Sequence, residues 1–147
     1  MHYNIIHIIH LLCAILFIGV VFFEVILLEG IRVKLGNVLM EQVEAGIINR
    51  AKKIMPWVVL TLFISGIIMT GTHFKNFDFH TLFSSSFHLL LTIKILLATS
   101  VLVHFVTAIR SAHTGCMNSK RFQWTHLSVF THMIVIVILA KMMFWSW

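Results

Sequence analysis

Four long apolar stretches constrain the fold of this chain more than any other feature. They cover residues 4–30, 53–71, 87–109 and 122–145, with ends approximate. A helix needs roughly 20 apolar residues to cross a bilayer, because each residue adds about 1.5 Å. Hydrophobic residues make up 59% of the chain and charged residues 11%, which excludes an ordinary soluble domain. We therefore expect an all-α integral membrane four-helix bundle that forms a single transmembrane domain, residues 1–147.

The basic residues predict how the chain is oriented in the membrane. The two connections after the first and third spans hold eight of the eleven Lys and Arg residues: Arg32, Lys34, Arg50, Lys52, Lys53, Arg110, Lys120 and Arg121. Basic connections face the cytoplasm, so we expect both termini outside, as in a bacterial inner (cytoplasmic) membrane protein. The first stretch lacks a basic leader and a cleavage site, so it is expected to be retained. The net charge of +6 then reflects topology, and no nucleic-acid partner is expected.

Ionisable side chains inside the apolar stretches are the functional candidates, because they are costly in hydrocarbon and usually have a partner or a role. They are His7, His10, Glu24, Glu29, Lys94, His104, His126, His132 and Lys141. Residues near span ends can reach the headgroups, which suits Glu29, Lys141 and His7. Seven-residue spacing puts His10, Phe17 and Glu24 on one helical face, which we predict to point into the bundle.

Proton relays, copper sites and haem ligation are the three chemistries that intramembrane histidines favour. An electron-transfer haem takes one axial ligand on each face. Counting about 1.5 Å per residue, His10 lies roughly 9 Å from the outer end of its span and His104 roughly 9 Å from the inner end of its own. Their levels differ by about 12 Å across a hydrocarbon layer of about 30 Å. They are therefore expected to serve different irons, unless one of them is not a ligand.

The depth estimate assigns histidine partners at each rim. At the inner rim, His126 lies about 6 Å into its span and His132 about 15 Å, so His126 is the better match for His104. At the outer rim, His10 or His7 would pair with His88, and His73 is a substitute. His88 and His104 lie on opposite faces of one helix, which argues against two haems in one core. Lys94 and Lys141 are cations near the rims of the membrane and are suited to pair with haem propionates. For Lys94, an ion pair with Glu24 is the alternative.

These residues carry a family resemblance. The segment "HLLCAILFIG" from His10 to Gly19 resembles the first helix of the CopD-like and HemJ-like membrane proteins, and "NRAKKIMPWVVLTLFISGI" resembles their second, with Pro56 and Gly66 matching. Lys94 lies where that superfamily has a third-helix Lys, followed by His104. The resemblance implies a four-helix bundle that holds haem b, with His10 as the matching ligand. It departs at Phe17, where the family has Trp, and at "FQWTHLSVF", where HemJ-like proteins have Asn-Glu-x-Pro.

The resulting hypothesis is a b-type haem membrane protein, with one or two haems, that acts in transmembrane or quinone-linked electron transfer. The expected iron ligands are His10, His88, His104 and His126. Expected partners are the lipid bilayer and a quinone or porphyrin, and self-association stays open. The resemblance leaves two alternatives. One is a HemJ-like protoporphyrinogen oxidase. The other is a CopD-like copper transport or tolerance protein that uses His and Met, for which the alternative is that the methionines of the last span are packing residues. The "HTGCM" segment at 113–117 is either a soft-metal site, as for Cu(I), or a solvated turn.

Overall fold

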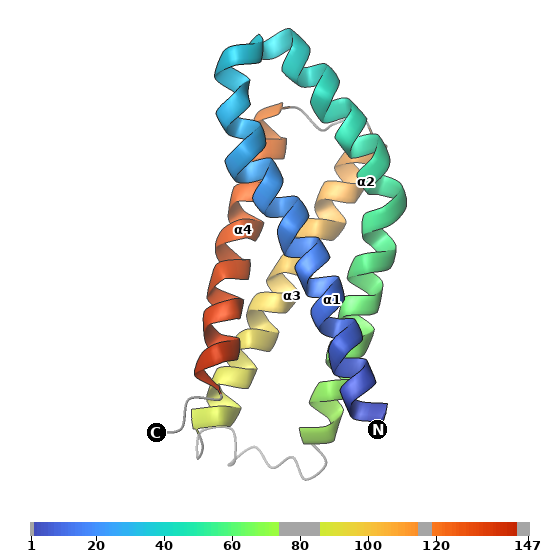
Figure 1. The fold of residues 1–147 in the computed structure, drawn as a ribbon, viewed down its shortest axis with the longest axis vertical. Helices are drawn as coiled ribbons and strands as arrows, with labels where there is room; N and C mark the ends of the chain where they lie inside the picture. The colour runs from blue at the N-terminus through green and yellow to red at the C-terminus, as the bar shows by residue number, and fades with distance from the viewer. Residues whose placement is uncertain (1, 74–85, 115–118, 144–147) are drawn as a thin grey trace.

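The computed structural model of the chain describes residues 2–73, 86–114 and 119–143. Its elements, in chain order, are α1 (His2–Phe22), the π-helical segment η1 (Phe23–Leu28), α2 (Glu29–His73), α3 (Ser86–His113) and α4 (Ser119–Met142). All regular structure in these ranges is helical, as the sequence predicts (Figure 1). The first residues of α1 and the last residues of α4 lie at one end of the molecule.

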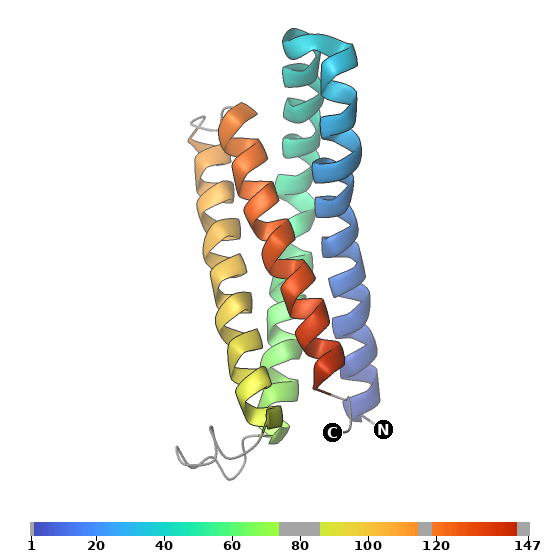
Figure 2. The same cartoon turned by 90° about the vertical axis from the view of Figure 1, so that its left-hand side faces the viewer.

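The chain reverses direction inside α2 at a single glycine. Gly36 has φ 72° and ψ 164°, and no other described residue has a positive φ. This backbone region is almost exclusive to glycine, because a Cβ would collide with the neighbouring peptide groups. Helical residues continue on both sides of Gly36, and Figures 1 and 2 show the two arms running side by side. A one-residue turn therefore joins two long antiparallel helical arms.

Three helical stretches in the described part of the chain are long and apolar enough to cross a membrane: Tyr3–Gly71, Phe87–His113 and Gln123–Met142. The expectation of four separate spans is therefore wrong in count. The first two expected spans are the two arms of a single helical stretch, which no connecting loop separates and which turns only at Gly36. Residues 31–52 were expected to connect the first two spans. They instead extend both arms, and Figure 2 shows this hairpin reaching beyond α3 and α4.

Packing follows chain order, with α1 against α2 and α3 against α4, while η1 and α1 also contact α4. The main core takes residues from all four helices: Phe17, Val21, Val59, Val101, Val129 and Met133. A smaller cluster under the Gly36 turn joins Leu28 to the fully buried Met40. Most other large apolar side chains are exposed on the outer helix faces, as for Ile8, Trp57 and Val103. A bilayer would cover such a surface.

Polar contacts join the helices at the end that holds Gly36. Lys52 Nζ on α2 donates to the Ala112 carbonyl near the end of α3, at 2.7 Å. The last carbonyls of a helix have no partner within the helix and carry partial negative charge, so a lysine there is favourable. This contact fixes α2 against α3, where the two helices otherwise touch little.

Candidate functional site

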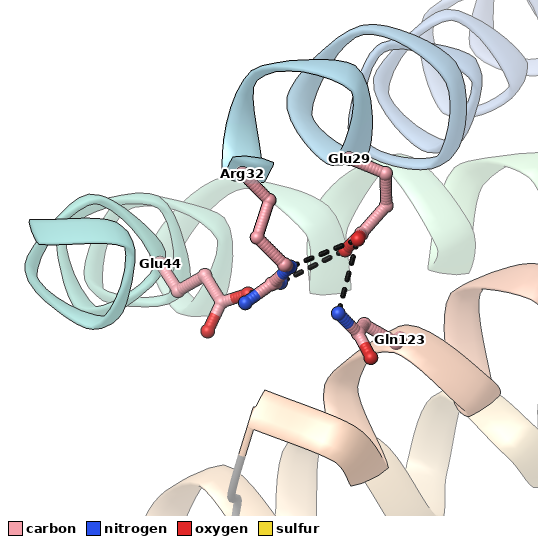
Figure 3. A network of polar contacts seen from close by, with 4 residues as sticks. All are labelled: Glu29, Arg32, Glu44 and Gln123. Carbon is pink, nitrogen blue, oxygen red and sulfur yellow. Dashed lines mark hydrogen bonds and ion pairs between the residues drawn. The ribbon is translucent and has the colours of Figure 1, made fainter. Parts of the chain in front are cut away.

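An ion-pair network binds the base of the hairpin to α4 (Figure 3). The Arg32 guanidinium donates to both Glu29 oxygens, at 2.9 and 2.8 Å, and also pairs with the buried Glu44 on the returning arm of α2. Gln123 on α4 donates from Nε2 to Glu29 Oε2 at 3.0 Å. Glu29 was expected to reach the headgroups. It instead accepts from Arg32 and Gln123, and together with Arg32 it joins both arms of the hairpin to α4.

Beside this network lies a buried carboxylate–imidazole pair. Glu24 belongs to η1, where the wider π-helical turn displaces side chains relative to an α-helix, a distortion frequent at functional sites. Only 3% of Glu24 is exposed, and its Oε2 lies 2.7 Å from His126 Nε2 on α4. Phe17 is also buried, so the predicted inward face of the first span is confirmed at Phe17 and Glu24. The ion pair expected as an alternative for Glu24, with Lys94, is not formed.

The pair opens into a pocket of about 310 Å³. Glu24 and Glu29 supply carboxylates to its wall, Gln123 an amide and His126 an imidazole. Trp124 adds an exposed indole, and Val25 and Leu127 add apolar surface. The pocket therefore combines an acid–base pair with an aromatic face, at the same end of the bundle as the Glu29–Arg32 pair.

His104 and His132 form a reciprocal pair between α3 and α4. Each Nδ1 lies 2.8 Å from the carbonyl four residues earlier, Ser100 for His104 and Ser128 for His132. Each Nε2 lies 3.2 Å from the serine hydroxyl of the other helix. Because a carbonyl only accepts, Nδ1 carries the proton, Nε2 accepts, and the serine donates. The two rings are 5.6 Å apart between centroids.

The histidine beside His104 is not the one that the depth estimate favoured. His126 was the better depth match for His104, yet the structure places His132 beside His104 and gives His126 to Glu24. The depth estimate assumed straight, untilted helices, whereas Figure 2 shows α4 crossing its neighbours obliquely.

His10 is held by α2. Its Nδ1 lies 3.0 Å from the Leu62 carbonyl and 3.0 Å from Ser65 Oγ, and the serine hydroxyl itself donates to carbonyls of its own helix. Both partners accept, so Nδ1 carries the proton and Nε2 keeps its lone pair in the neutral ring. A Cβ on Gly66 would lie 3.3 Å from His10 Cε1, so the absence of a side chain there makes room for the imidazole.

Lys94 lies near this histidine. It is half-buried on α3 and close enough to the His10 imidazole to interact electrostatically, as is His7. Across the described ranges no carboxylate pairs with Lys94. A partly desolvated ammonium without a counter-ion is costly, and an anionic ligand would remove that cost.

The remaining predicted residues lie apart from these contacts. His88 is half-buried at the start of α3, with its ring 5.7 Å from that of Phe87. His7 is exposed beside Tyr3, and Lys141 is exposed in the last turn of α4. Met133 belongs to the main core, as a packing residue would. Of the "HTGCM" segment, 115–117 lie outside the described residues.

Sequence reasoning missed the serines that hold the imidazoles. A signal was present, because "SVLVH" and "SVFTH" place Ser four residues before His in both Ser100–His104 and Ser128–His132. Four-residue spacing puts both side chains on one helix face. Two such motifs on antiparallel neighbours can exchange hydrogen bonds, and the structure shows this exchange.

Within the described ranges, no group of three or more His, Cys, Asp or Glu side chains is placed to hold a metal ion. Searches of protein-family models, curated proteins and solved structures find no match to this chain.

Proposed function

We propose that this protein binds haem b in the membrane and acts in transmembrane or quinone-linked electron transfer. The observation that carries the proposal is the His10 imidazole, whose Nδ1–H donates to the Leu62 carbonyl and whose Nε2 keeps its lone pair. Metal-ligating histidines commonly have this arrangement, because the hydrogen bond fixes the tautomer and makes the ligating nitrogen more basic. The resemblance to CopD-like and HemJ-like proteins points to the same histidine.

The residues around His10 suit a haem on two counts. Its Nε2 offers an axial nitrogen, and the half-buried Lys94 offers a cation to a propionate. The Leu62 carbonyl and Ser65 hold the ring, and Gly66 leaves room for it. Bound haem would supply one-electron redox chemistry, and the protein would tune its potential through the axial ligand, burial and nearby charge. His88 on α3 is the candidate for a second iron ligand.

Copper handling is the second candidate, and the His104–His132 pair favours it. Imidazole nitrogen is a good copper ligand. In both rings the proton is on Nδ1, so Nε2 has its lone pair available for a metal. Only a serine hydroxyl, 3.2 Å away, would have to be displaced at each ring. The oxidase alternative shares the His10 site with the haem proposal, and turnover of protoporphyrinogen separates the two.

The orientation proposed for this function follows from the basic residues. The Gly36 end of the bundle, which holds Arg32 and Lys52, would face the cytoplasm, and the start of α1 would face outward. His10 and Lys94 then serve the outer half of the membrane, while Glu24 and His126 serve the inner half. This arrangement suits a protein that takes electrons at one surface and passes them toward the other.

The test compares two histidines on one turn of α1. His10→Ala should lose haem or convert it to five-coordinate high-spin iron, because an axial nitrogen is removed. His7→Ala is the matched control and should keep the wild-type spectrum, since His7 is exposed. The readout is the reduced-minus-oxidised spectrum of the purified protein. Full haem with an unchanged low-spin spectrum in His10→Ala would overturn the assignment.

A further inference from the structure

The pocket beside η1 has no part in the His10 site, and its chemistry is distinct. Its volume of about 310 Å³ lies at the small end of the range for small-molecule sites, which suits a single substituted ring. Val25 and Leu127 contribute apolar walls, so a ligand dissolved in the bilayer meets a compatible surface. Trp124 is 72% exposed, so its indole is available for contact with the ring of a ligand.

Glu24 gives this pocket its specificity. The carboxylate is almost completely buried, and among the described residues its Oε2 has an ion-pair contact with His126 but no aligned hydrogen bond. A buried carboxylate oxygen without a hydrogen bond loses the solvation that water would give it. A ligand in the pocket that donates a hydrogen bond to the Glu24 carboxylate would offset this loss.

The second carboxylate of the pocket is already satisfied. Glu29 accepts from the Arg32 guanidinium twice and from Gln123 once, so its charge is neutralised in place. His126 accompanies Glu24, so the pocket holds an acid–base pair rather than a surplus of negative charge. These groups favour a neutral ligand with hydroxyl donors over a metal cation.

We infer that this pocket binds the ring of a hydroquinone, with one hydroxyl donating to the Glu24 carboxylate that lines the pocket and the ring against Trp124. The choice of ligand class rests on the proposed electron-transfer function, for which a lipid-soluble quinol is a suitable donor. Its reduced form carries the hydroxyl donors that Glu24 needs. The oxidised quinone has only acceptor oxygens, which would face the lone pairs of the carboxylate. The site therefore selects the reduced form.

The test measures binding of tetramethylhydroquinone and of its quinone to the purified full-length protein in lipid nanodiscs. Equilibrium dialysis under nitrogen keeps the hydroquinone reduced, and binding to empty nanodiscs is subtracted. A hydrogen bond to an ionised group favours the hydroquinone by about tenfold or more. Glu24→Gln should remove most of this preference. Glu41→Gln makes the same chemical change at an exposed site on α2 and should leave binding unchanged.

The Trp124 side chain is exposed, so Trp124→Ala should fold normally. This variant should weaken hydroquinone binding severalfold, because it removes the aromatic surface against which the ring packs. Equal affinity for the two redox forms would overturn the inference. Two other results would also overturn the inference, and both require that Trp124→Ala binds the hydroquinone as tightly as wild type. In the first, Glu24→Gln folds and also binds with wild-type affinity and preference. In the second, Glu24→Gln does not fold, so that Trp124→Ala alone decides. Dialysis needs no haem, so a colourless protein that selects the hydroquinone would overturn only the haem proposal.

Discussion

Gly36 provides the sharpest test of the hairpin. Its φ of 72° and ψ of 164° lie in a region that is essentially restricted to glycine, where another residue costs of order 1–3 kcal/mol. A Cβ at this position meets no neighbouring atom within 4 Å, so the cost comes from the backbone rather than from packing. We therefore expect Gly36→Ala to destabilise the protein by about 2 kcal/mol.

Gly46 is the matched control for this prediction. It lies in the helical part of α2 beyond the turn, and a Cβ there also meets nothing within 4 Å. Alanine is favoured over glycine in a helix by about 0.5–1 kcal/mol, so Gly46→Ala should stabilise the protein. Both variants can be unfolded by titrating a denaturing detergent into mixed micelles and followed by far-ultraviolet circular dichroism. A Gly36→Ala protein as stable as wild type would refute a turn built on positive φ.

Two further substitutions test the ion-pair network and the His10 environment. Arg32→Met should cost about 3 kcal/mol in the same unfolding assay, because Glu44 keeps a buried charge without its guanidinium. Adding Glu44→Leu should recover most of that loss, and no recovery would show that this pair does not couple the two arms. Gly66→Ala should shift the spectrum or potential of bound haem by pressing on His10, whereas Gly71→Ala, with open space around it, should not. Equal effects of the two alanines in a redox titration would contradict the role of Gly66.

The sequence predicted the helical class and the buried stripe, because both depend on local pattern. Long apolar stretches leave few alternatives to helices in a membrane, and the spacing of Phe17 and Glu24 placed them on one face. The reversal at Gly36 was not predicted, because the glycine stands among residues that are helical on both sides. Glycine in such a run is compatible with either an uninterrupted helix or a turn.

Pairing between helices was harder to predict than the face of any one helix. His126 was assigned to His104 by depth, but depth counted along the chain ignores tilt and the wider turn of η1. Helix tilt and the π-helical turn determine that His132 of α4 lies beside His104 of α3, while His126 of α4 contacts Glu24. The partner serines and Gln123 were overlooked because only ionisable side chains were considered as candidates inside the spans, and these partners are uncharged.

The haem content of the wild-type protein tests the central claim most directly. The protein should be produced with an adequate haem supply, purified in mild detergent, and assayed by pyridine haemochrome against protein concentration. We predict at least one haem b per chain, with a sharp α-band on reduction that marks a low-spin iron. A helical, folded protein that carries no haem under these conditions would contradict the assignment of His10 and Lys94 as a haem site.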